Sequence, residues 1–179
     1  MRSLEENLTQ YAACHRDRRN IATHLVGIPL IVFATVLALA LVSFPVGGIA
    51  VTPAALASIA ACAYYFRLDP AFAAAMAAAL FAMCALASEL VARLPAGGAL
   101  ALSAAIFAIG WALQFWGHRF EGVKPAFLDD ARQLLIGPLF VCAEIFFFFG
   151  AKPRLRHYIE QRVGPTVARR VHSPATGTR

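Results

Sequence analysis

The chain has 179 residues, of which 60% are hydrophobic and only 15% are charged, and its formal net charge is +6 at pH 7. A soluble domain is normally nearer half apolar and a quarter charged, and the apolar runs here are too long for a soluble core. This composition excludes an ordinary soluble protein and predicts an all-α, polytopic membrane helical bundle. The basic residues flank apolar runs, which is typical of membrane topology and argues against nucleic-acid binding.

The N-terminal segment, residues 3–15, is predicted to form a short amphipathic helix. Ser3 and Glu6 have the spacing of a capping box, in which each side chain bonds the backbone N–H of the other. An apolar stripe at helical spacing ends on His15, so we expect this imidazole to point inward. Such a helix lies on a membrane surface or packs over a bundle.

Four longer apolar runs, at about 20–44, 49–66, 71–91 and 99–117, predict four membrane-spanning helices. The first is expected to be capped by Asn20 and kinked at Pro29. A fifth run, 134–150, is only 17 residues long and carries Gly137-Pro138 and a central Glu144. We interpret it as a re-entrant or interfacial helix, with five complete spans as the alternative. Residues 1–165 would form one membrane-embedded domain, followed by a disordered tail at 166–179.

The basic residues also predict the orientation. Arginine and lysine cluster before the first run, between the second and third, and after the fourth, which places both termini on the cytoplasmic side. A bacterial-type inner membrane fits this pattern. The polar residues of the apolar runs would then gather near one cytoplasmic membrane face: His15, His24, Gln114, His118, Glu121 and, from the fifth segment, Glu144.

The end of the fourth run concentrates three of these groups on one helical face. Gln114, His118 and Glu121 fall within about 60° of one another at 100° per residue. Ionisable groups at such a depth are expensive, so they usually face a protein interior or a water-filled cavity. We therefore expect a metal or acid–base site at this membrane face.

Three imidazoles and one or two carboxylates from separate segments form a ligand set for a first-row metal. Two histidines, a carboxylate and open positions are typical of non-haem iron(II) oxygenases, although zinc accepts the same ligands. Asn20 and Gln114 could hold the ring N–H groups of these histidines. Two other classes stay open on the residues alone. One is an electron-transfer or quinone protein with haem between His24 and His118, and the other is a non-enzymatic lipid-binding or transport protein.

Three stretches, in order over about residues 8–160, resemble the membrane 2-hydroxy fatty acid dioxygenase family. The first is Tyr11-x-x-x-His15-x-x-x-x-Asn20-x-x-x-His24-x-x-x-x-Pro29. The second is Ile109-Gly-Trp-x-x-Gln114-Phe-x-Gly117-His118, with Glu121-x-x-x-Pro125-Ala126-x-x-Asp129 after it. The third is Gly137-Pro138-x-Phe140-x-x-x-Glu144, with Pro153-Arg-Leu155 beyond.

This resemblance implies an iron(II)-dependent enzyme that shortens a 2-hydroxy fatty acid by one carbon, using O2 and releasing CO2. The histidines of the family fall on His15, His24 and His118, which become the expected metal ligands. Glu121 or Glu144 would be a further ligand or a base. Arg119 or Lys124 could attract the substrate carboxylate, while the acyl chain lies between apolar helices in contact with membrane lipid.

Overall fold

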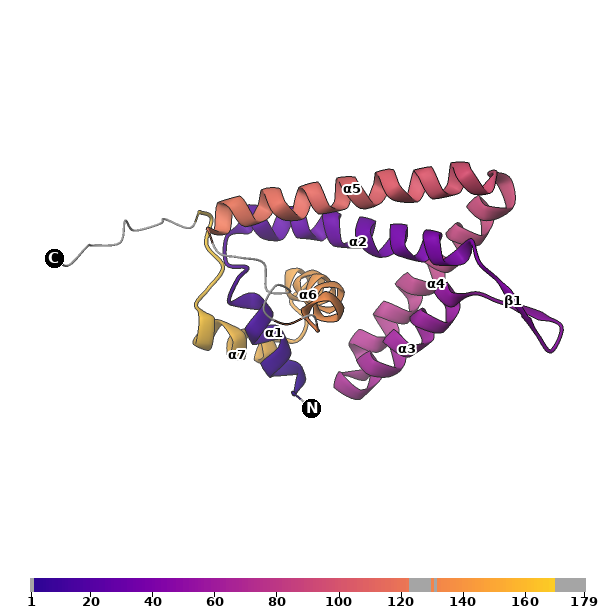
Figure 1. The fold of residues 1–179 in the computed structure, drawn as a ribbon. Coiled ribbons are helices and arrows are strands. Elements are labelled where there is room, and N and C mark those ends of the chain that lie inside the picture. Colours follow the sequence, from indigo (N-terminus) through magenta and orange to yellow (C-terminus); the bar gives the residue numbers. More distant parts are fainter. Residues whose placement is uncertain (1, 123–129, 131, 170–179) are drawn as a thin grey trace.

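The computed structural model describes residues 2–122, 130 and 132–169. Within them the chain forms seven helices and one small hairpin, which confirms the all-α prediction. Figure 1 shows α2 and α5 side by side, with α1 and α7 grouped at one end of this pair and the hairpin at the other. The two termini of the described chain therefore lie at the end where α2 begins and α5 ends.

The N-terminal helix α1 (Leu4–Ala12) begins with the predicted capping box, because the Ser3 hydroxyl accepts from the Glu6 backbone and the Glu6 carboxylate from Ser3. Its apolar residues pack in the main core against α6 and α7. The chain then turns through residues 13–17 into α2 (Arg18–Ala40). This turn lets the end of α1 and the start of α2 face each other.

The middle of the chain forms a hairpin and two helices. Strands β1 (Phe44–Val46) and β2 (Ile49–Val51) pair antiparallel around Gly47 and Gly48, which both have positive φ. Helices α3 (Pro53–Leu68) and α4 (Pro70–Arg93) each begin with proline, and are capped by Thr52 and Asp69. Proline suits the first helical turn, where its missing N–H costs nothing.

Helix α5 (Ala96–Glu121) returns antiparallel to α2, and glycines allow their backbones to approach closely. A Cβ on Gly27 would lie 2.9 Å from the carbonyl oxygen of Gly110, and a Cβ on Gly110 would lie 2.9 Å from that of Gly27. A Cβ on Gly117 would overlap Thr23 and Asn20. Because small residues permit this contact, the start of α2 and the end of α5 form one rigid wall.

Helix α6 (Gln133–Phe148) is seen end-on in Figure 1, so it crosses the α2–α5 pair at a steep angle. It bends by 113° into α7 (Pro153–Val163). The Tyr65 hydroxyl of α3 donates to the carbonyl oxygen of Leu135 at 2.8 Å, which ties α6 to the rest of the bundle. Helix α6 packs against α2, and also against α1 and α4.

Helices α2, α4 and α5 are long and apolar enough to cross a membrane, and the bent α6–α7 pair would count as a fourth crossing. Large apolar side chains point outward, with Phe81 77% exposed and Trp116 60% exposed. Exposed apolar surface of this extent fits contact with lipid. The described chain therefore fits a membrane protein with three to four spanning helices.

Several predicted boundaries were wrong. The first long helix is capped by Asp17, whose carboxylate accepts from the Arg19 backbone, and Asn20 lies inside the helix. The helix ends at Ala40, because residues 44–51 form the hairpin. The second apolar run begins as a strand, which leaves only 16 residues for α3.

Candidate metal centre

His24 lies in the second turn of α2 and is buried, with 1% of its surface exposed. Its Nδ1 lies 2.9 Å from the carbonyl oxygen of Asn20. A carbonyl oxygen can only accept, so Nδ1 donates and the lone pair of the neutral ring is on Nε2. The Asn20 backbone thus orients the imidazole and fixes its tautomer.

His15 lies in the turn between α1 and α2 and is also 1% exposed. Its Nδ1 donates to the carbonyl oxygen of Tyr11 at 2.6 Å, and its ring stacks on the Tyr11 ring with centroids 4.2 Å apart. Burial, and then the neighbouring His24, hold the pKa of His15 well below its usual value. His15 is therefore neutral at physiological pH, the form in which imidazole binds a metal.

His118 completes the cluster from the last turns of α5, with 8% of its surface exposed. Its ring centroid lies 5.0 Å from those of both His15 and His24. One ligand nitrogen from each of the three rings lies within 4.8 Å of the others. Gly117 is required for this placement, since a side chain there would overlap Asn20 and approach the His24 ring.

The three histidines fit a metal ion. The Nε2 atoms of His15 and His24 are 3.0 Å apart, although both rings use Nδ1 as the donor. Two facing lone pairs at this distance repel unless a cation or a proton lies between them. Two imidazole nitrogens about 2.1 Å from one ion would be about 3.0–3.4 Å apart for ligand angles of about 90–109°.

Glu121 lies beside this cluster, but its carboxylate accepts hydrogen bonds from other residues. It is fully buried, and its carboxylate accepts from the backbone N–H groups of Arg16 and Asp17, both at 2.9 Å, and from the Asn20 amide at 3.1 Å. Among the described residues, the group of close metal-ligand atoms holds three histidines and no carboxylate. Glu121 thus fastens the end of α5 to the turn that carries His15.

The histidines line a cavity of about 70 Å³ that is otherwise mostly apolar. Two amides also line it. Gln114 is 5% exposed and Gln133 is 1% exposed. The Nε2 of Gln114 and both polar atoms of Gln133 have no hydrogen-bond partner among the residues that the structure describes. Gln133 was not predicted from the sequence as a site residue. The one feature that could have indicated it is the position of this amide at the start of an apolar run.

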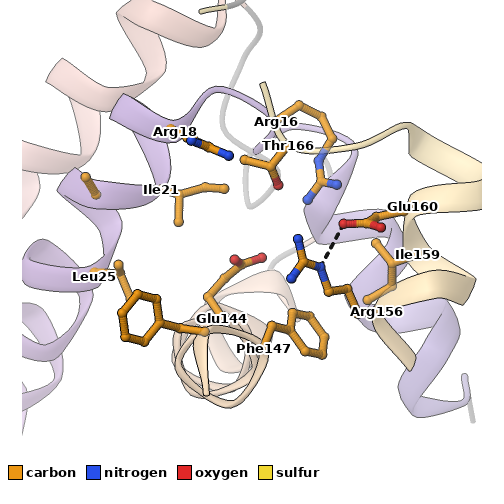
Figure 2. Close-up of a pocket in the computed structure, with 12 residues that line it drawn as sticks. Arg16, Arg18, Ile21, Leu25, Glu144, Phe147, Arg156, Ile159, Glu160 and Thr166 are labelled. Carbon is orange, nitrogen blue, oxygen red and sulfur yellow. Dashed lines mark hydrogen bonds and ion pairs between the residues drawn. The ribbon is translucent and has the colours of Figure 1, made fainter. Parts of the chain in front are cut away.

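Glu144 lies in a different place, in a cavity of about 460 Å³ between α2, α6 and α7. Figure 2 shows its carboxylate pointing toward Arg16, Arg18 and Arg156, and the dashed line marks the Arg156–Glu160 ion pair at 2.8 Å. The histidine cavity is lined by other residues of α6. Glu144 is therefore part of a charged cluster on this side of α6, away from the histidine cavity.

Of the two cations expected to attract substrate, only Arg119 lies in the part of the chain that the structure describes. Arg119 is exposed on the outer face of α5, beside Phe115 and Trp116. Lys124 lies outside the described residues.

The fold and this site define a class: a helical protein with apolar helices long enough to span a membrane and a buried cluster of three histidines. The family described as 2-hydroxy-palmitic acid dioxygenase Mpo1-like matches residues 1–149. Because this match covers well over half of the chain, the protein belongs to that family, and the resemblance seen in the three sequence stretches is confirmed.

One relative is the 2-hydroxy-palmitic acid dioxygenase MPO1 of Saccharomyces cerevisiae (strain ATCC 204508 / S288c), which is 42% identical to this chain over 57 residues. The aligned part is 31% of this chain and 33% of the yeast protein, so the match spans about a third of the relative's length. No solved structure matches the chain.

Proposed function

We propose that this protein is an iron(II)-dependent dioxygenase that shortens 2-hydroxy fatty acids by one carbon. The reaction converts RCH(OH)COOH and O2 into RCOOH, CO2 and H2O, so that O2 takes up the four electrons released by the substrate. The observation that carries the proposal is the pair of Nε2 atoms of His15 and His24, which face each other at 3.0 Å in a buried cavity shared with His118. Membership of a family named for a 2-hydroxy-palmitic acid dioxygenase supports the choice of substrate.

The ligands would be His15, His24 and His118. Bound iron(II) would supply open coordination positions for O2 and for the substrate's hydroxyl and carboxylate oxygens. The carbonyl groups of Tyr11 and Asn20 hold two of the rings in the tautomer that ligation requires. These carbonyl groups do the orienting that was expected of the Asn20 and Gln114 amides.

Glu121 acts in this proposal by holding the His15 turn in place. The proposed role of Arg119 and Lys124 is to attract the carboxylate of the substrate to the membrane surface, since the exposed Arg119 follows His118 directly in α5. The helices would lie in a bacterial-type inner membrane, with both termini on the cytoplasmic side.

A haem-based electron carrier is a poorer fit. A haem held by His24 and His118 would need space for its macrocycle beside them, whereas the cavity that they line has a volume of only about 70 Å³. A non-enzymatic lipid-binding protein would need no close set of imidazole nitrogens. The histidine geometry therefore favours metal chemistry over both alternatives.

The test uses full-length protein purified without oxygen in detergent. We expect about one iron per chain, and conversion of 2-hydroxypalmitate to the acid one carbon shorter when air is admitted, with one O2 consumed per product. Protein reconstituted with zinc is the control and should consume no O2. Protein that binds no iron and yields no shortened product would disprove the proposal.

A further inference from the structure

A second cavity lies next to the histidine centre, between α2, α4 and α6. Its volume is about 340 Å³, and its walls are apolar. The α4 side of the wall combines two kinds of residue. The small side chains of Ala75 and Ala79 leave space, and the flexible side chains of Met76 and Met83 border that space. Methionine adapts its shape to the ligand that it contacts, so this wall suits an unbranched apolar chain.

The two cavities are neighbours in space. Ile28 and Val32 of α2 and Pro138 of α6 line both of them. Ile28 and Val32 follow His24 by one and two turns of α2. A molecule at the histidines could therefore continue past these three residues into the apolar groove.

The histidine cavity itself fits only a small polar group. Its 70 Å³ is about the space of two or three water molecules, which leaves no room for a long chain. Buried polar groups normally have partners, and Gln114 and Gln133 bring amide atoms without partners among the described residues into this cavity. A 2-hydroxy carboxylate offers the acceptors and the hydroxyl donor that two such amides need.

We propose that the groove between α2, α4 and α6 binds the acyl chain of the 2-hydroxy fatty acid, while Gln114 and Gln133 bind its 2-hydroxy carboxylate in the histidine cavity. This inference rests on the proposed function for the identity of the ligand. The groove determines chain length, and its open side admits the chain from the bilayer. A bilayer lipid held in the groove as a permanent filler is the competing occupant.

The first experiment measures binding without turnover. Iron-free protein in nanodiscs is exposed to 2-hydroxypalmitate that carries a photoreactive diazirine near the end of its chain, and the labelled peptides are mapped by mass spectrometry. We expect labels on residues 75–83 of α4 and on Ile145 or Phe146 of α6, and expect unlabelled 2-hydroxypalmitate to suppress them. Labels elsewhere, or labels that excess 2-hydroxypalmitate leaves unchanged, would show a permanent lipid or no chain site and overturn the proposal.

The second experiment changes the groove. Ala79→Phe fills it, and Ala78→Phe is the matched control, since Ala78 is an exposed alanine of the same helix that does not line the groove. We expect Ala79→Phe to raise the KM for 2-hydroxypalmitate about tenfold, the effect of removing about two methylene groups from apolar contact. The KM for 2-hydroxyoctanoate should stay within about twofold in both variants, because we expect the shorter chain to end before Ala79. Equal losses for both substrates would overturn the assignment.

Two further variants keep the test independent of misfolding. Met83→Ala enlarges the groove, so it should shift the preference toward longer chains, a gain that an unfolded protein cannot show. Gln133→Leu should raise the KM for both chain lengths alike without loss of iron, and a chain-dependent effect would contradict the head-group role. If the wild-type protein is labelled in the groove but does not convert 2-hydroxypalmitate, the groove is supported and the proposed reaction is disproved. The acyl-chain groove and the proposed reaction can therefore fail separately.

Discussion

The Nε2 atoms of His15 and His24 face each other at 3.0 Å, and both rings are held in place by backbone carbonyls through Nδ1. Removing any one of the three imidazoles should therefore remove the metal. We expect His15→Ala, His24→Ala and His118→Ala each to lower iron content at least about tenfold. Elemental analysis after purification without oxygen measures this, and His157→Ala, an exposed histidine on α7, is the control that should keep full iron. A His24→Ala variant with wild-type iron would contradict the centre.

Glu121 and Glu144 compete for the role of the functional carboxylate, and their surroundings predict different results. Glu121→Gln weakens three buried hydrogen bonds to the His15 turn, so we expect a loss of about 1.5–3 kcal/mol of stability and about 10–100-fold in iron affinity. Glu144→Gln should leave iron affinity unchanged, because Glu144 lies in the arginine-lined cavity. Thermal unfolding and iron titration of both variants decide the matter, and the reverse pattern would assign the site to Glu144.

The close contact of α2 with α5 predicts a strong effect of a single methyl group. A Cβ at position 27 would lie 2.3 Å from Nε2 of Gln114 and 2.9 Å from the Gly110 carbonyl oxygen. We expect Gly27→Ala to cost about 1–3 kcal/mol through overpacking and to displace the Gln114 amide. Gly97→Ala is the matched control, because a Cβ there meets open space, and it should be neutral or slightly stabilising. Similar melting temperatures for the two variants would rule out the tight contact.

Acid should destabilise the metal-free protein through His15. The pKa of His15 is well below its usual value in the folded state, mainly because the ring is buried, and is about 6.5 in the unfolded chain. Between these values the unfolded state binds more protons, so the free energy of unfolding falls as the pH falls below about 6.5, by up to about 1.4 kcal/mol per pH unit. Above that pH, His15 contributes no pH dependence.

The measurement is thermal unfolding of metal-free protein in detergent between pH 7.5 and 5.5. His15→Phe keeps an aromatic ring against Tyr11 and removes the titrating group, so its melting temperature should change less over this range. Parallel profiles for the two proteins would show that His15 is not the source.

Local patterns in the sequence predicted much of the fold. The capping box at Ser3 and Glu6 and the long apolar helices expected at about 71–91 and 99–117 depend on neighbours in the chain, and they are present in α1, α4 and α5. The cap at Asp17 was not predicted because asparagine and aspartate are equally good N-cap residues, and Asn20 was chosen. Only the contacts that the turn makes in the folded chain favour Asp17 as the N-cap of α2.

The candidate site was predictable where it lies on regular helices, and less so elsewhere. The positions of His24 and His118 follow from two antiparallel helices whose polar ends meet. The hydrogen bond from the Arg16 backbone N–H to Glu121 joins residues 105 apart, which no local pattern encodes. Gln133 enters the cavity because α6 crosses the α2–α5 pair, and this crossing depends on tertiary packing.

The placement of His15 in the turn after α1, outside the long apolar helices, has a consequence for how the protein would lose its metal. An ion shared by His15 and His118 would cross-link the segment that carries α1 to the end of α5. This cross-link would limit how far α1 can move away from the bundle. Without the ion, α1 would depend on its packing, on the Arg2–Asp130 ion pair and on the Glu121 hydrogen bonds. The N-terminal helix would then be the first segment open to a protease, and its digestion would report iron occupancy from outside the bilayer.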